Sequence, residues 1–96
     1  MAETTRADDA LAVRRRKIKF RSWHRGMREV DLIMGRFADA FVDAMAPAEL
    51  DAYERLMEMP DPELLGWVIG ERSPPADVDS TMLRQLRAFH RVPHGT

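Results

Sequence analysis

Val30-Asp31-Leu32-Ile33-Met34-Gly35-Arg36-Phe37-Ala38-Asp39-Ala40-Phe41-Val42-Asp43-Ala44-Met45 is the stretch of sequence that decides the fold. Its apolar side chains recur three and four positions apart, which places them on one side of an α-helix. They are Val30, Ile33, Met34, Phe37, Phe41, Ala44 and Met45. Gly35 costs this helix roughly 1 kcal/mol relative to alanine, so we expect a kink there or a close approach of another chain. The segment therefore predicts a helix whose broad apolar stripe is covered by neighbouring helices.

Two helices are predicted directly beside this segment. Leu11–His24 forms a short, very basic helix, and Gly26 ends it by taking a left-handed conformation, as glycine often does just past a helix end. On the other side, Pro47 opens a third helix, because proline is favoured at the first helical position. Short connections join these helices, so we expect them to pack against one another as neighbours.

Two more helices complete the predicted fold. A fourth helix has Asp61 as its N-cap with Pro62 at the first helical position, and a fifth runs from about Asp79, also an N-cap, to Arg91. No segment shows the alternation of a strand, so the predicted fold is all-α, a small compact bundle of about five helices. The expected core includes Val30, Phe37, Phe41, Leu56, Leu65, Trp67, Leu86 and Phe89.

The length of 96 residues is that of one small domain with little room for a cleft that encloses a cofactor and a substrate together. We expect a single domain over residues 11–92, a disordered N-terminal tail at 1–10 and a C-terminal tail at 93–96. Cysteine is absent, and no apolar run approaches the ~20 residues of a membrane span. The first residues resemble neither a secretory signal nor a mitochondrial presequence. We therefore expect a monomer in a bacterial cytoplasm.

Charge is distributed unevenly although the formal net charge is only −1. The basic residues of the first helix and of the junction that follows it precede most of the acids, which gives the molecule a positive end. They are Arg14, Arg15, Arg16, Lys17, Lys19, Arg21, Arg25 and Arg28. Such a field speeds the encounter with an acidic partner without specifying which partner it is.

The run from Arg14 to Arg21, with Phe20 and Trp23 among its residues, has an alternative interpretation as a nucleic-acid footprint. Lysine and arginine neutralise phosphates, and aromatic rings stack on bases. The sequence pI of about 6.3 is well below the value above 9 that is typical of a dedicated nucleic-acid-binding domain, and no known nucleic-acid-binding motif accompanies the run. A positive face used for docking is the favoured interpretation, and a small nucleic-acid-binding regulator remains the alternative.

No catalytic or metal site is predicted. His24, His90 and His94 are too scattered for a metal site, and no carboxylate pair stands out for acid–base chemistry. No nucleophile is identifiable beside His24, which we interpret as a surface or interface residue. The sequence thus favours a binding protein over an enzyme.

Arg25-Gly26-Met27-Arg28-Glu29 gathers charges of both signs around a glycine at the junction of the first two helices. If Gly26 is the N-cap, Glu29 occupies the third helical position and its carboxylate can reach back to the N–H of the cap. An ion pair between Arg25 and Glu29 is a second structural interpretation. Recognition of a partner is compatible with both, because a carboxylate fixed by a cap is also a preorganised contact.

This motif, within residues 21–31, and the block at residues 59–67 (Met-Pro-Asp-Pro-Glu-Leu-Leu-Gly-Trp) together resemble the SdhE family of small helical assembly factors. The resemblance implies that the chain binds the flavoprotein subunit of succinate dehydrogenase, and of fumarate reductase as a further client, and promotes covalent attachment of FAD. It implies that FAD belongs to the client, whose own histidine attacks the 8α-methyl carbon of the flavin. The residues expected to contact the partner are Arg21, His24, Arg25, Gly26, Arg28, Glu29 and Asp31.

Overall fold

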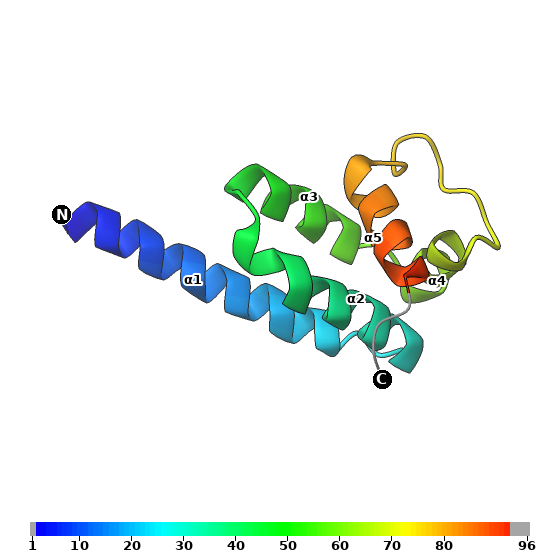
Figure 1. The fold of residues 1–96 in the computed structure, drawn as a ribbon, viewed down its shortest axis with the longest axis horizontal. Helices are drawn as coiled ribbons and strands as arrows, with labels where there is room; N and C mark the ends of the chain where they lie inside the picture. Colours follow the sequence, from blue (N-terminus) through cyan, green and yellow to red (C-terminus); the bar gives the residue numbers. More distant parts are fainter. Residues whose placement is uncertain (1, 93–96) are drawn as a thin grey trace.

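Two antiparallel helices form the centre of the structure, a computed structural model that describes the backbone of residues 2–92 and the side chains of residues 7–92. Helix α1 (Ala2–Trp23) is long and basic, and α2 (Arg28–Phe41) runs back along its C-terminal half (Figure 1). A single 3-10 turn, η1 (Val42–Ala44), follows α2. The stripe of α2 therefore meets α1 on one side and the later helices on the other.

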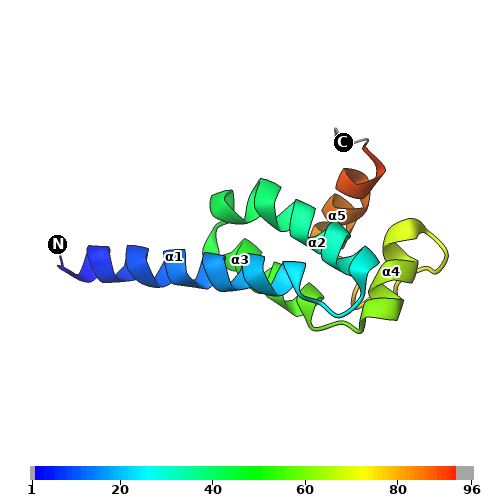
Figure 2. The same ribbon diagram turned by 90° about the horizontal axis from the view of Figure 1, so that it is seen from below.

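Three shorter helices cover the rest of α2: α3 (Pro47–Met57), α4 (Asp61–Ile69) and α5 (Thr81–Arg91). Helix α5 contacts α2, α3 and α4, so it closes the bundle (Figures 1 and 2). The described residues contain five α-helices and no strand, which confirms the predicted all-α bundle. Pro47 is the first residue of α3, as predicted.

The predicted disordered tail at residues 1–10 does not match the structure, in which α1 begins at Ala2. Residues 7–10 are exposed, so the helix there is supported by local preference and not by packing. Alanines at 7 and 10 favour helix. This part of α1 extends beyond the other helices in both views (Figures 1 and 2). The predicted tail at 93–96 lies outside the described residues.

Two predicted N-caps are each displaced by one residue. Pro60 precedes α4, so Asp61 is the first helical residue and its carboxylate is free to bind elsewhere. Ser80 caps α5 in place of Asp79, and its Oγ accepts a hydrogen bond from the Leu83 N–H at 3.2 Å. Serine and aspartate are comparably good caps, so neighbouring candidates cannot be distinguished from sequence alone.

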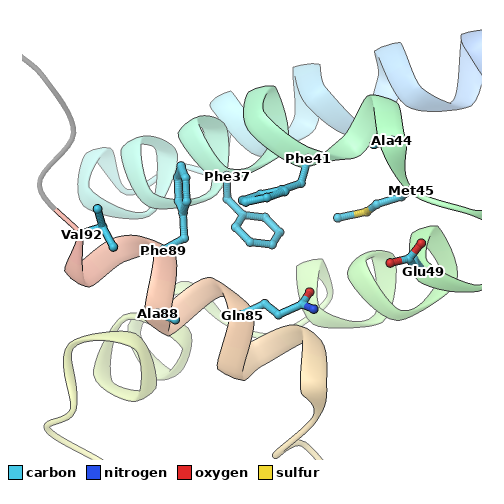
Figure 3. A pocket seen from close by; sticks show the side chains of 9 residues that line it. All are labelled: Phe37, Phe41, Ala44, Met45, Glu49, Gln85, Ala88, Phe89 and Val92. Carbon is cyan, nitrogen blue, oxygen red and sulfur yellow. The ribbon is translucent and has the colours of Figure 1, made fainter.

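The core follows the predicted stripes with one clear exception, Phe41. Val30, Phe37, Leu56, Trp67 and Leu86 are buried as expected, while Leu65 and Phe89 are partly buried. Phe41 is 41% exposed. Its ring lies beside those of Phe37 and Phe89 in the wall of an open hollow of about 420 Å³ between α2, α3 and α5 (Figure 3). The loss of ~3–5 kcal/mol expected for full burial of this phenylalanine therefore does not apply.

Gly35 lies at a close approach between α1 and α2. A Cβ atom at this position would be 2.2 Å from Cδ2 of Trp23, so only glycine leaves room for the indole. The Trp23 Nε1–H points at the Asp39 carboxylate, with both oxygens 3.2 Å away. The expected close approach at Gly35 is confirmed, and the approaching segment belongs to the same chain.

Gly35→Ala should lower the free energy of unfolding by about 1–2 kcal/mol, because overpacking against the indole outweighs the gain in helix preference. Gly66→Ala is the matched control: its Cβ would meet the Arg72 side chain at 3.2 Å, and that side chain can move aside. Chemical denaturation of both variants measures the difference. A Gly35→Ala protein as stable as the parent would contradict the packing described here.

Tyr53 supplies a buried polar link between three helices. Its hydroxyl oxygen lies 3.2 Å from the Met34 carbonyl oxygen and 2.8 Å from Oγ of Ser22, which in turn lies 2.8 Å from the Ile18 carbonyl oxygen, so two hydroxyl hydrogens are shared among three contacts. Both side chains are fully buried. Burial raises the pKa of Tyr53 from its ordinary value of 10.0 to about 12, although the hydrogen bond with Ser22 opposes the shift.

Because the pKa of Tyr53 is higher in the folded state, its contribution to stability is complete below pH 10 and is lost as the pH rises through about 12. Tyr53 is the only tyrosine, so tyrosinate absorbance during an alkaline titration reports on it alone. We expect tyrosinate to appear only together with unfolding or near pH 12. Titration near pH 10 with the helical circular dichroism intact would show that the hydroxyl is accessible to water.

Candidate partner-binding site

The junction between α1 and α2 is a tight turn built around Gly26. This residue has a φ of +108°, a conformation that strains any L side chain, and Met27 then enters α2 with extended backbone. The predicted positive φ of Gly26 is confirmed, but the N-cap of α2 is Met27. Gly26 is exposed, and a Cβ atom built on it would lie 3.8 Å from Oδ2 of Asp61. The junction therefore lies against the start of α4.

Arg25 fixes this arrangement from inside the fold. Its guanidinium pairs with Asp61 at 2.8 Å (Nη2) and 3.0 Å (Nε), and it also donates to the carbonyls of Met57 and Met59. The side chains of Arg25 and Asp61 are only 11% and 14% exposed. A planar guanidinium can hold a carboxylate and two carbonyls at once, which the ammonium of lysine does less well. Arg25 thus ties the α1–α2 junction to the α3–α4 junction.

Asp31 holds the backbone of the same residue. Its Oδ1 accepts a hydrogen bond from the Arg25 N–H at 2.5 Å, and its side chain is half-buried. Both the backbone and the side chain of Arg25 are therefore fixed within the fold. Of the seven residues predicted to contact a partner, Arg25 and Asp31 are the two that point inward, so they position the site.

Arg28 and Glu29 are exposed in the first turn of α2, next to the exposed Gly26. Neither side chain makes a hydrogen bond or an ion pair with residues 7–92. The capping interpretation of Glu29 is wrong, because Met27 is the N-cap and no side chain caps α2. The Arg25–Glu29 ion pair is also absent, since Arg25 is paired with Asp61. Glu29 still benefits from the positive end of the helix, and its carboxylate is available to a partner.

Arg21 and His24 extend the exposed surface onto the last turn of α1. The His24 ring stacks on Phe20, with ring centroids 4.0 Å apart. Its Nδ1 lies 2.6 Å from the Phe20 carbonyl and must be the donor, which leaves Nε2 facing solvent. Arg21, His24, Gly26, Arg28 and Glu29 are therefore all exposed at or near the junction. Their role in binding stays a prediction.

Asp61 is the functional residue that sequence reasoning missed. It lies 36 residues from Arg25, and its position before Pro62 made it look like an ordinary helix cap. The available signal was the second block of the resemblance, residues 59–67, which contains it. The two blocks meet in space because the Arg25–Asp61 pair joins them.

Other kinds of site find no support in the part of the chain that the structure describes. It contains no group of three or more histidine, aspartate or glutamate side chains placed to hold a metal ion. Within it, no helix is long and apolar enough to cross a membrane.

Residues 16–90 match the model of the family described as "Flavinator of succinate dehydrogenase". The chain belongs to this family. The match contains α2, α3 and α4, nearly all of α5 and both sides of the Arg25–Asp61 pair. The resemblance drawn from the two sequence blocks is thereby confirmed.

Individual relatives agree with the family match. The chain is 43% identical over 89 residues to the FAD assembly factor SdhE of Acetobacter pasteurianus, covering 93% of this chain and 82% of that protein. It is 36% and 30% identical to the mitochondrial succinate dehydrogenase assembly factor 2 of Schizosaccharomyces pombe and of Dictyostelium discoideum, over 86% and 76% of this chain. It spans only 58% and 52% of those two proteins. No solved structure matches the chain.

The inward and outward members of the motif should respond differently to truncation. Arg25→Ala leaves Asp61 and two carbonyls without their donor in a mostly buried place, so it should cost about 2–4 kcal/mol of stability. Glu29→Ala removes an exposed side chain and should cost less than about 1 kcal/mol. Denaturant unfolding followed by circular dichroism measures both. Equal stability of the two variants would refute the structural role of Arg25.

Proposed function

We propose that this chain binds the flavoprotein subunit of succinate dehydrogenase and promotes covalent attachment of FAD to a histidine of that subunit. The observation that carries the proposal is the division of the family motif in this fold. Arg25 and Asp31 hold the junction from inside, and Gly26, Arg28 and Glu29 face outward without partners in residues 7–92. A rigid, charged and unpaired surface is what a specific protein partner requires.

Glu29 and Arg28 are the groups that contact the client in this proposal. The Glu29 carboxylate accepts hydrogen bonds from an arginine or from backbone amides of the client, and Arg28 donates to a carboxylate or carbonyl. Gly26 adds no side chain, so the client backbone can approach the turn closely. Because the turn is fixed before binding, little conformational freedom is lost when the complex forms.

The flavin chemistry belongs to the client, where the histidine and FAD supply the reacting atoms. The chain acts as a binding protein that favours the flavin-loaded conformation of the client. It holds the client in an arrangement in which the histidine and the flavin lie close together. The proposal assigns no stably bound cofactor and no catalytic residue to this chain.

The proposal describes a monomer acting in a bacterial cytoplasm. The bacterial relative that covers most of the chain supports this setting. The family resemblance extends this proposal to the flavoprotein subunit of fumarate reductase as a further client.

Glu29→Ala should fold normally and yet reduce covalent flavin on the client by tenfold or more, because losing one member of a desolvated charged contact costs about 2–5 kcal/mol of binding. The assay mixes the purified client subunit with FAD and either protein and reads flavin fluorescence in a denaturing gel. Glu71→Ala is the matched control: it removes another exposed carboxylate, in the segment that follows α4.

Thermal melts of the same samples separate loss of function from loss of fold. The proteins are compared at a concentration at which the parent does not yet saturate the assay. If Glu29→Ala then yields as much covalent flavin as the parent, the motif is excluded as the client-binding site. An equal loss with Glu71→Ala would show that general negative charge matters and not the motif.

A further inference from the structure

The basic residues of α1 divide into two sets according to helical phase. Arg14 pairs with Asp51 at 2.6 Å and with Glu54, Arg15 donates to the Met45 carbonyl at 2.7 Å, and Lys19 pairs with Asp43 at 2.9 Å. These three face the bundle. The two pairs with Arg14 raise its pKa further above its usual value, mainly through the hydrogen bond with Glu54. This inner set holds α1 against α3 and η1.

The outer set lies on the opposite side of α1 and makes no ion pair with residues 7–92. It follows a spacing of three, one, three, one and three residues, which keeps every member on one helical face. We name this face the α1 strip, and its residues are Val13, Arg16, Lys17, Phe20, Arg21 and His24. All six are exposed. The strip ends at His24, directly beside the turn that presents Gly26, Arg28 and Glu29.

Phe20 is the centre of the α1 strip and is 64% exposed. Such exposure leaves unused the roughly 25 cal/mol per Å² that burial of its ring would gain, so the side chain contributes little to the fold. Its ring is nevertheless held in place: His24 stacks on it at 4.0 Å with the planes 19° apart, and His24 is itself fixed by the Phe20 carbonyl. An exposed but ordered aromatic ring surrounded by cations has the composition of an interface hot spot.

We infer that the α1 strip is a docking surface for an acidic patch of the client, in which carboxylates surround an apolar depression that receives Phe20. The inference rests on the proposed function and names a second contact for the same client. Arg16, Lys17 and Arg21 surround the ring with positive charge, so carboxylates at the rim of the depression complete the match. At the other end of the surface, Glu29 requires a cation or backbone donors. The client must therefore present carboxylates opposite the α1 strip and a cation or backbone donors opposite Glu29. This arrangement sets the orientation of the client on the chain.

Nucleic acid fits the α1 strip less well. In the part of α1 whose side chains the structure describes, only Arg16, Lys17 and Arg21 remain after the inner set is paired, and Asp8 and Asp9 are exposed on the preceding turns. One face of the Phe20 ring is covered by His24 and cannot stack on a base. A strand of phosphates would also meet an overall charge of −1. The observations thus favour an acidic protein surface.

The test uses surface plasmon resonance at two salt concentrations to measure the rates at which the chain binds the purified flavoprotein subunit and dissociates from it. Phe20→Ala should weaken affinity by about 30-fold, the usual effect of removing a hot-spot side chain. Joint replacement of Arg16, Lys17 and Arg21 by glutamine should slow association about tenfold and reduce its salt dependence. The matched control replaces the exposed Arg55, Arg72 and Arg91 by glutamine, with the same change in net charge.

Thermal melts should show all variants folded, because every substituted side chain is exposed. Parent-like affinity of Phe20→Ala, measured while Glu29→Ala binds weakly, would overturn the α1 strip and leave the proposed function standing. Failure of the parent itself to bind the subunit would overturn both. Micromolar binding of single-stranded RNA or DNA at physiological salt, lost in Phe20→Ala, would instead make nucleic acid the occupant of the strip.

Discussion

The guanidinium of Arg25 joins two turns that are far apart in sequence, and the outer surface depends on this connection. It bridges the Asp61 carboxylate and the carbonyls of Met57 and Met59, in a place where few water molecules can replace it. A buried charge is tolerated when it is fully paired and hydrogen-bonded, and here the pairing also fixes geometry. With Arg25 held by Asp31 as well, the following glycine turn has little freedom, and the exposed end of α2 points in one direction.

The same logic extends along α1, which serves as scaffold on one side and as a recognition surface on the other. Trp23 rests on Gly35, and the Ser22 hydroxyl meets Tyr53, so the last turns of α1 are locked against α2 and α3. The inner cations Arg14, Arg15 and Lys19 are paired with groups of the bundle. Because an α-helix has 3.6 residues per turn, a run that looks uniformly basic in sequence forms two surfaces with different roles.

Much of this fold can be predicted from sequence, because α2 carries a strong periodic apolar stripe and two glycines indicate a turn and a close helix contact. Gly26 has the expected positive φ, and Gly35 marks the expected close approach. The inward role of Arg25 could not be predicted, since Asp61 lies 36 residues away and locally resembles a cap. The exposure of Phe41 escaped prediction for a related reason: periodicity shows that a face is apolar but not how far neighbouring helices cover it. Helical residues before Leu11 were missed because they have no packing pattern, only local preference.

A double-mutant cycle on Arg25 and Asp61 tests the central claim, that the arginine of the motif acts within the fold. The free energies of unfolding of the parent, Arg25→Met, Asp61→Asn and the double variant give a coupling energy from which the separate effects cancel. The structure predicts a favourable coupling of about 1–3 kcal/mol, as expected for residues that share a mostly buried charged contact. Strictly additive effects would contradict the claim, because they would show that Arg25 does not interact with Asp61 within the fold.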